Sequence, residues 1–394
     1  MKNNLSRLFF TALAALTLAA APAFAADTPD TETDTGDTVT YDTPANPEPE
    51  MPDGDTREEE AQPDAAQTAG ILPLGTVIRS AWPRFSDGNP VIKKIDLERK
   101  MSDPSITGDN AAALAVLVKL LHKKDDLPLT LDTALELVSG DKTETNFKRT
   151  AVKLRNANRA LFAKALPDFD KMQQGHATDC YFFSGTGWIA KYRPEVIANA
   201  ITKEADTYTV KFPSGERASF AAPTDAEIAL NDSASTLTDG IWMTVLAKAE
   251  GIIEARTNAR RAAIADPNMR VDVGGGPLAI VKRWTGKKPI SFHLGEDAET
   301  KRIRKALIRM DEKRLMAEVF AKKASGHIVG NHCYAIFGFN ADTDMVTVWN
   351  PWGDNFTPKG PDGPKYGYAR RHGIFQIPLK EFIKRFYFMS IEKE

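Results

Sequence analysis

A predicted β-hairpin constrains the fold of this chain more than any other feature of its sequence. Two runs rich in aromatic and aliphatic residues, 332–339 and 345–349, flank the polar turn sequence at 340–344. This order is typical of two antiparallel strands joined by a turn. Because an antiparallel hairpin returns the chain to where it began, Asn350 is expected beside His332. The fold must therefore include an antiparallel sheet that carries a polar pair at one end.

The first 70 residues hold no candidate for a folded core. Residues 1–25 combine Lys2 and Arg7 with an apolar stretch and a small-residue cleavage sequence, which predicts a secretory signal peptide. An uncut membrane anchor is the alternative, but the apolar run is short and no stop-transfer charges follow it. Residues 26–70 contain no Leu, Ile, Phe or Trp and predict a disordered acidic linker. We therefore expect an exported protein, secreted or periplasmic, with no membrane span in the mature chain.

Charge divides the chain into an acidic tail and a basic body. Residues 26–70 carry a net charge of −13 and residues 71–394 a net charge of +9, although the whole chain has only −2. Within the body, residues 71–167 have the apolar spacing of a helical N-terminal domain. Its helices are predicted over 111–123, from Thr130 or Asp132 to Gly140, and over about 145–166. We interpret the basic face of the last helix as solvated surface or as a dock for the acidic tail, and we expect no nucleic-acid partner.

The two cysteines of the chain, Cys180 and Cys333, exclude a disulfide scaffold and a Cys-rich zinc module, so no metal site is predicted. Cys180 follows a polar, glycine-containing loop and opens an apolar stretch, so a helix dipole would favour its thiolate. A buried, inert cysteine is the alternative for a lone thiol. Gln174 can supply an amide N–H to an oxyanion, beside the Cys180 backbone N–H. Together with His332 and Asn350, these residues form the set that a nucleophilic cysteine needs.

These segments resemble the catalytic core of the calpain family of cysteine proteases. Residues 174–181 are similar to the family's nucleophile motif Gln-Gly-x-x-Gly-Asp-Cys-Trp, and residues 331–334 are similar to its Gly-His-Ala-Tyr. Residues 350–353 match its Asn-Pro-Trp-Gly in full. The resemblance covers about 168–394. The substitutions within these motifs remove no catalytic group; they are Thr178, Tyr181, Asn331 and Cys333.

The resemblance implies an α+β, papain-like fold with two lobes in a catalytic domain at 168–394. The first lobe, about 171–256, would be mainly helical, and the second, about 270–394, mainly antiparallel sheet. It also implies a cysteine-type endopeptidase that hydrolyses protein or peptide substrates. Cys180 would be the nucleophile, His332 the base, Asn350 the group that orients the imidazole and Gln174 the oxyanion donor. Trp352 would shield the histidine–asparagine hydrogen bond, with plain core packing as the alternative.

Calcium is a possible cofactor, because the resemblance implies calcium-dependent alignment of the two lobes. Two positions that hold carboxylate ligands in animal calpains are Lys171 and Phe356 here, and the nearest acids are Asp170 and Asp354. Lysine and phenylalanine cannot bind calcium, which takes oxygen ligands. We therefore expect that activity does not require micromolar calcium.

Two further expectations concern Cys333 and the N-terminal region. Side chains alternate along a strand, so Cys333 is expected to face away from His332 and to form no disulfide with Cys180 in active protein. Residues 26–170 are interpreted as a module that restrains activity, with a spacer or adaptor as the alternative. The sequence sets no oligomeric state and no cleavage preference.

Two other functions remain open at the level of sequence. One is another papain-fold acyl-transfer enzyme, such as a transglutaminase or a peptidoglycan-processing enzyme, although these usually have Asp or His at the position of Asn350. The other is a non-catalytic binding protein that kept the fold. Loss of a catalytic side chain would favour the binding protein, and none of the four catalytic candidates is lost.

Overall fold

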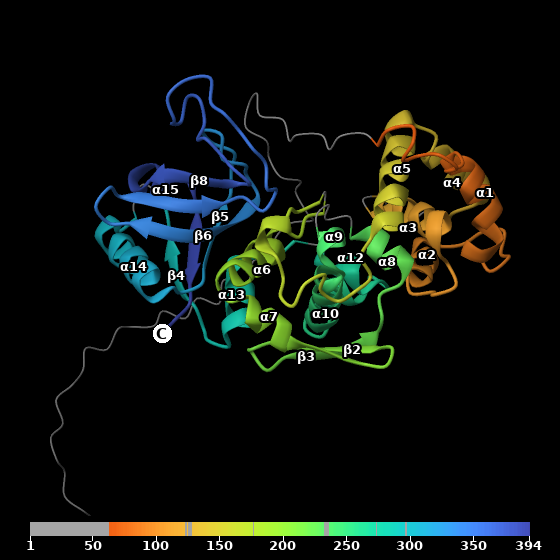
Figure 1. Cartoon of the computed structure of the whole chain (residues 1–394), viewed down its shortest axis with the longest axis horizontal. Helices are drawn as coiled ribbons and strands as arrows, with labels where there is room; N and C mark the ends of the chain where they lie inside the picture. The colour runs from red at the N-terminus through yellow and green to blue at the C-terminus, as the bar shows by residue number, and fades with distance from the viewer. Residues whose placement is uncertain are drawn as a thin grey trace, which may run out of the picture. The chain divides into compact units, whose positions relative to one another are not determined.

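A computed structural model describes residues 63–122, 124, 128–175, 177–231, 236–272, 274–295 and 298–394. The predicted signal peptide and most of the predicted linker, up to residue 62, lie outside the described residues. The described residues belong to one compact unit of mixed α+β structure with antiparallel sheets (Figure 1). Within these ranges, no helix combines the length and the apolar character needed to cross a membrane.

The N-terminal part of the described chain is helical, as its apolar spacing predicts. Its helices are α1 (Leu74–Phe85), α2 (Lys94–Lys100), α3 (Gly108–His122), α4 (Leu131–Leu137) and α5 (Asp141–Asn156). Helix α3 is rich in Ala, Leu and Val and is buried on most of its surface against α1 and α5. The Thr130 hydroxyl caps α4 by accepting the backbone N–H of Thr133 at 3.2 Å, and Gly140 precedes α5 as its N-cap.

The predicted C-terminal end of the third helix is wrong, because α5 ends at Asn156 rather than near residue 166. The following residue, Ala157, is extended, and the chain then pairs with a distant segment. The carbonyl of Ala160 accepts the N–H of Ile241 at 3.0 Å, and the N–H of Ala163 donates to the carbonyl of Asp239 at 2.8 Å. These tertiary hydrogen bonds replace the local ones that would have continued the helix.

The middle of the chain is mainly helical and includes a small sheet, which has three strands among the described residues, in the order β1-β2-β3. Its elements are η1 (Phe169–Lys171), α6 (Cys180–Tyr192), α7 (Pro194–Ala200), β1 (Ile201–Glu204), β2 (Thr207–Lys211), β3 (Arg217–Ala221), α8 (Asp225–Leu230), α9 (Thr236–Asp239), α10 (Trp242–Glu254), α11 (Ala259–Ala262), α12 (Pro267–Val271) and α13 (Pro277–Thr285). Helix α10 packs against α12 and β3, and α8 packs against α3. The N-terminal helices are therefore continuous with this middle region.

The C-terminal part forms a larger antiparallel sheet, with the order β4-β9-β5-β6-β7-β8 among the described residues. Its elements are β4 (Ile290–His293), α14 (Thr300–Lys313), β5 (Ala317–Ala321), β6 (His332–Asn340), β7 (Met345–Trp349), β8 (Ile374–Pro378), α15 (Leu379–Arg385) and β9 (Phe388–Ile391). The predicted hairpin is confirmed, since β6 pairs with β7 and Ala335 lies opposite Trp349. A register shift between Ile336 and Gly338 marks a bulge in this hairpin.

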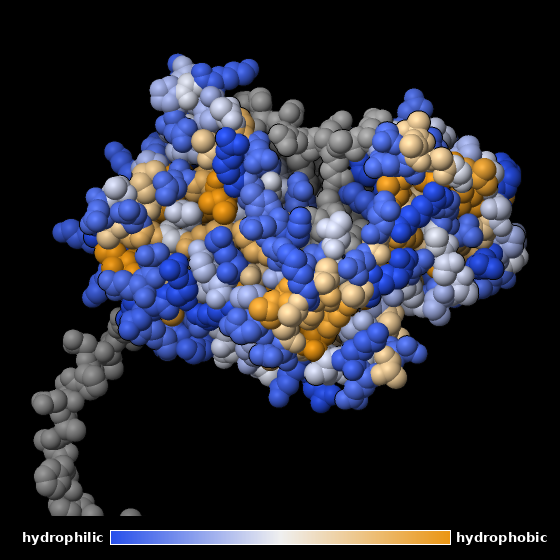
Figure 2. All heavy atoms as spheres, viewed as in Figure 1, coloured by the Kyte–Doolittle hydropathy of each residue, from blue (hydrophilic) through white to orange (hydrophobic). Residues whose placement is uncertain are grey.

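The two faces of the larger sheet contribute to two hydrophobic clusters. On β6, Cys333, Ala335 and Phe337 belong to a cluster with the N-terminal helices and α6, whereas Tyr334 and Ile336 belong to a cluster with α14 and α15. The alternation follows from the period of two along a strand. The visible face of the described residues is mostly hydrophilic, with scattered apolar patches (Figure 2). Strand β6 thus lies between the helix that begins at Cys180 and the helices on the far side of the sheet.

Candidate active site

Cys180 is the first residue of α6 and is buried, with 8% of its surface exposed. The first turn of this helix is closed by the carbonyl of Asp179, which accepts the backbone N–H groups of Phe182 and Phe183, both at 2.9 Å. The thiol therefore lies at the N-terminus of a helix of 13 residues. The helix dipole favours negative charge at this end and so favours a thiolate.

Helix α6 approaches the larger sheet closely because two of its residues lack side chains. A methyl group at Gly187 would collide with the indole ring of Trp349, and one at Gly185 would collide with Ile280. The indole N–H of Trp188 in the same helix donates to the carbonyl of Ile336 on β6 at 3.0 Å. These contacts fix the start of the helix, and with it the thiol, against β6.

His332 and Asn350 meet at the end of the hairpin, as the strand pairing predicts. The Nε2 atom of His332 lies 2.8 Å from Oδ1 of Asn350, and His332 is fully buried. The ring of Trp352 lies over the imidazole, with ring centroids 4.8 Å apart, and its backbone N–H donates to the same Oδ1 at 3.2 Å. The indole thus packs beside the imidazole as a member of a hydrophobic cluster, and this contact fits the predicted shielding role and plain core packing alike.

The thiol of Cys180 interacts with both His332 and Cys333. The backbone N–H of Cys333 donates to Sγ of Cys180 at 3.4 Å. The Cys333 thiol contributes most to lowering the pKa of Cys180 well below its ordinary value, against burial, which raises it, and the charge of the nearby His332 lowers it further. Among the described residues, Nδ1 of His332 has no hydrogen-bond partner. Burial and the neighbouring Cys180 raise the pKa of Cys333 well above its ordinary value. Of the two cysteines, Cys180 is therefore the one whose ionisation is favoured, and Cys333 is the one whose ionisation is disfavoured.

The expectation that Cys333 faces away from the site is wrong. Cys333 lies on the face of β6 that packs against α6, together with Ala335 and Phe337, and its thiol contacts Cys180. Strand alternation holds, but His332 is the first residue of the strand and reaches Asn350 at its edge. The face of β6 that lies against the nucleophile is thus the face that carries Cys333. Both cysteines are free thiols in the structure.

Gln174 lies close to the nucleophile, but its amide is engaged within the loop that precedes α6. The Nε2 group donates to the carbonyl of Ala177 at 2.7 Å and to Oδ1 of Asp179 at 2.9 Å. The backbone N–H of Gln174 donates to the carbonyl of Pro351 at 2.7 Å, which joins this loop to the end of the hairpin. For Gln174 to bind an oxyanion, one of the two amide hydrogen bonds has to be exchanged for substrate.

The nucleophile loop is held by an aspartate that the sequence analysis missed. The backbone N–H and the hydroxyl of Thr178 both donate to the carboxylate of Asp272. Nε2 of His122, at the end of α3, lies 3.9 Å from the same carboxylate. Burial, followed by the charges of Asp272 and Cys180, raises the pKa of Asp179 to about 7. The helical N-terminal part therefore contacts, through Asp272, the loop that carries the nucleophile.

A buried carboxyl behind the nucleophile was also missed. Glu318 on β5 is fully buried, and the hydroxyl of Ser184 on α6 donates to it. Burial raises the pKa of Glu318 well above its ordinary value and so favours the neutral carboxyl. A single acid between apolar residues of a strand, as in the sequence Ala317-Glu318-Val319, is the signal that could have indicated it.

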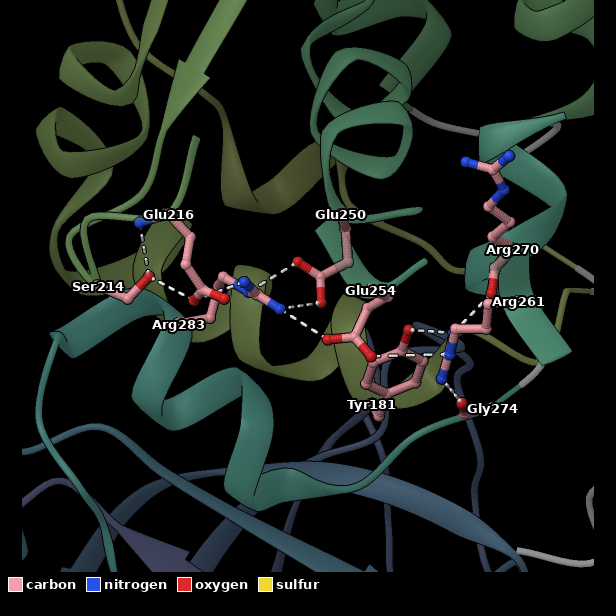
Figure 3. A network of polar contacts seen from close by, with 9 residues as sticks. All are labelled: Tyr181, Ser214, Glu216, Glu250, Glu254, Arg261, Arg270, Gly274 and Arg283. Carbon is pink, nitrogen blue, oxygen red and sulfur yellow. Dashed lines mark hydrogen bonds and ion pairs between the residues drawn. The ribbon is translucent and has the colours of Figure 1, made fainter. Parts of the chain in front are cut away.

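A buried ionic network supports the helices beside α6 (Figure 3). Arg283 on α13 pairs with Glu250 at 3.0 Å, with Glu254 at 2.7 Å and with Glu216 at 2.6 Å. Two of these carboxylates lie on α10, so the network ties α13 to α10 and to the start of β3. Paired charges can be buried where an isolated one would cost several kcal/mol.

The same network extends toward the residue after the nucleophile. Arg261 donates to the hydroxyl of Tyr181 at 3.3 Å and also to the carbonyl of Gly274 (Figure 3). A side chain at the next residue, Gly275, would meet the Tyr181 ring at 2.6 Å. The hydroxyl and ring of Tyr181 thus hold the 274–275 segment.

Asp354, the carboxylate nearest to one calcium-ligand position of animal calpains, is already paired. Oδ2 of Asp354 accepts from Nε of Arg370 at 2.7 Å, and Oδ1 accepts from Nδ2 of Asn350 at 3.3 Å. The expected ligand positions are held by Lys171 and Phe356. In the part of the chain that the structure describes, no group of three or more His, Cys, Asp and Glu side chains could hold a metal ion. These residues do not fit a calcium site.

No family model and no curated protein matches this chain. The resemblance to the calpain family therefore stays a prediction based on the motifs. The functional argument depends on the contacts between Cys180, His332 and Asn350 themselves.

Proposed function

We propose that the protein is an exported cysteine endopeptidase with a papain-like, two-lobed catalytic core. The observation that carries the proposal is the placement of Cys180 at the start of α6 against β6, where the Cys333 N–H donates to its Sγ at 3.4 Å and the adjacent His332 bonds to Asn350 at 2.8 Å. The lowered pKa of Cys180 supports it further, because the thiolate is the nucleophilic form. A structural cysteine needs neither a lowered pKa nor an oriented histidine.

In the proposed reaction, the Cys180 thiolate attacks the carbonyl carbon of the scissile peptide bond. His332, which holds the proton of the thiol, gives that proton to the leaving amine. Water then attacks the thioester while His332 accepts a proton from it, and departure of the carboxylic acid restores the thiolate. Asn350 keeps the imidazole in one orientation throughout. The Cys180 backbone N–H would donate to the oxyanion, together with Gln174 once its amide has exchanged a loop acceptor for substrate.

The direct test is hydrolysis of fluorescein-labelled casein by Cys180→Ala and by the matched variant Cys333→Ala at pH 8. We expect Cys180→Ala to lose all activity while keeping its fold, because it lacks the attacking atom. Cys333→Ala keeps the nucleophile and should remain active. A folded Cys180→Ala protein that cleaves casein as the wild type does would refute the proposal. Inactive wild type that binds casein would favour the non-catalytic binding protein.

A further inference from the structure

The side-chain amide of Asn350 has two different ends, and each end has its own partner. Oδ1 faces Nε2 of His332 at 2.8 Å and accepts the backbone N–H of Trp352 at 3.2 Å. Nδ2 donates to Oδ1 of Asp354 at 3.3 Å. Rotation of the amide by half a turn would present an NH₂ group to His332 instead of an acceptor. The partners of the two ends, the Trp352 N–H on Oδ1 and Asp354 on Nδ2, therefore decide together which nitrogen of the imidazole carries the proton.

Asp354 is itself held in a buried ion pair. Its Oδ2 accepts from Nε of Arg370 at 2.7 Å, and the side chains of Asp354 and Arg370 are only 13% and 6% exposed. Arg370 also donates to the carbonyl of His327 at 3.3 Å, and its guanidinium lies 4.7 Å from the ring centre of Phe356. Arg370 thus balances the carboxylate charge, so that Asp354 can accept from Asn350 without being a buried, unpaired anion.

The backbone holds this pair in register with Asn350. Phe356 and Arg370 form an antiparallel bridge, with hydrogen bonds of 3.1 and 2.9 Å in the two directions. Gly373 donates its N–H to the carbonyl of Asp354 at 2.8 Å, and its carbonyl accepts the N–H of Asn350 at 2.9 Å. Gly373 has φ +74°, and a side chain there would collide with the carbonyl of Asn350. Residues 354–373 therefore return to Asn350 and anchor it from behind.

We propose that Asp354 and Arg370 are positioning residues for the proposed peptidase, acting through Asn350 on His332. Asp354 holds the Asn350 amide so that its oxygen accepts the Nε2 proton of His332. The other nitrogen, Nδ1, is then left to take the proton of Cys180. Arg370 fixes Asp354 and neutralises its charge. The inference rests on the proposed function, because only a base that exchanges protons with a thiol needs this orientation.

The test compares Asp354→Ala, Asp354→Asn and Arg370→Gln with two matched controls on the same segment, Asp362→Ala and Arg371→Ala. Both control residues are exposed. The first readout is casein hydrolysis, resolved into kcat and KM. The second is the rate at which iodoacetamide alkylates Cys180 at pH 6, followed on the peptide that contains it. Alkylation reports the thiolate and needs no peptidase activity, so it also separates this inference from the proposed function.

We expect Asp354→Ala to lower kcat and the alkylation rate together by about tenfold, the factor that corresponds to one lost hydrogen bond, with KM changed less than about twofold. Asp354→Asn should lose less of both rates, because its one carbonyl oxygen can still accept a hydrogen bond from Asn350. Arg370→Gln should lower kcat and the alkylation rate, as Asp354→Ala does. The two controls should match the wild type in both readouts.

Folded Asp354→Ala protein with wild-type kcat and wild-type alkylation overturns the inference. A lower melting temperature with both rates unchanged also overturns it, since the pair would then act on stability alone. If Asp354→Ala does not fold, Asp354→Asn and Arg370→Gln decide by the same two rates. If the wild type cleaves no casein but alkylation still falls in the variants, the inference stands and the proposed function fails.

Discussion

At the scale of single residues, the unusual feature of the site is a second thiol beside the nucleophile. The resemblance places alanine at the position of Cys333, and alanine has no donor in its side chain. Here the Cys333 thiol makes the largest contribution to the lowered pKa of Cys180, while its backbone N–H donates to Sγ at 3.4 Å. Two neighbouring groups, a thiol and an imidazole, therefore stabilise one buried thiolate.

The first prediction follows from this second thiol. Replacement Cys333→Ala removes the side-chain donor and keeps the backbone donor, so the pKa of Cys180 should rise. The pH profile of iodoacetamide alkylation at Cys180 should then shift to higher pH. Cys333→Ser can still donate and should shift less. Profiles of wild type and Cys333→Ala that coincide would show that the thiol does not support the thiolate.

The second prediction concerns calcium. Both carboxylate oxygens of Asp354 already accept a hydrogen bond, from Arg370 and from Asn350, and the guanidinium charge disfavours a cation beside them. Casein hydrolysis by the purified mature protein should continue unchanged in excess chelator. The same assay after calcium is added back serves as the control. Activity that disappears in chelator and returns with micromolar calcium would contradict this account and would make Asp354 and Asp170 the next residues to replace.

At the scale of elements, α6 and the hairpin of β6 and β7 determine where the reactive groups meet. The helix can lie against the sheet because Gly187 leaves room for Trp349 of β7, and Gly185 leaves room for Ile280 of α13 and for Glu318 of β5. A wider separation would move Cys180 away from β6, on which His332 and Cys333 lie. Close packing at the glycines is therefore a condition for the site, and it can be tested apart from the chemistry.

The third prediction uses the matched glycines Gly187 in α6 and Gly75 in α1. A methyl group at Gly187 would collide with Trp349, whereas one at Gly75 would make an ordinary contact of 3.6 Å with Leu135. Gly187→Ala should lower the free energy of unfolding by roughly 1–3 kcal/mol. Gly75→Ala should leave it unchanged or raise it by up to about 1 kcal/mol. Urea denaturation measures both, and equal effects of the two changes would show that α6 is not closely packed.

Much of the element pattern could be predicted from the sequence, and three of the failures share one cause. The hairpin is local, so its turn residues and apolar runs placed Asn350 beside His332 correctly. The end of α5 could not be predicted, because residues 160–163 pair with residues 239–241, far along the chain. Asp272 and Glu318 were missed for the same reason. Their partners are distant in sequence, and no local spacing connects them.

At the scale of the whole molecule, the N-terminal helices and the nucleophile's helix share one hydrophobic cluster. Polar contacts also join the N-terminal helices to the middle region. The carboxylate of Asp225 on α8 accepts the N–H of Gly108 at 2.9 Å and pairs with Arg159 at 2.7 Å. Residues 71–167 therefore support the rest of the fold directly, in addition to any restraint that they exert on activity.

The fourth prediction tests this dependence with two truncated chains. A chain beginning at Asp64 keeps every described helix and should fold as the full mature protein does. A chain beginning at Leu166 exposes the apolar surfaces that α3 and α5 cover, and it should be insoluble or lack a cooperative thermal transition. Circular dichroism during heating measures both. A chain from Leu166 that folds cooperatively and is as active as the full chain would show that the N-terminal region is only a spacer.

The central claim is that Cys180 is the nucleophile of a cysteine peptidase. Its most direct test is labelling of the full mature protein with an epoxysuccinyl inhibitor of cysteine peptidases, followed by peptide mass mapping and the casein assay. The account predicts one adduct per chain, located on Cys180 and not on Cys333, with loss of hydrolysis in proportion to labelling. It also predicts slower labelling of His332→Ala than of the wild type at pH 6, since the imidazole contributes to the lowered pKa of Cys180. Full labelling of Cys333 in place of Cys180, or labelling of Cys180 without loss of hydrolysis, would contradict it.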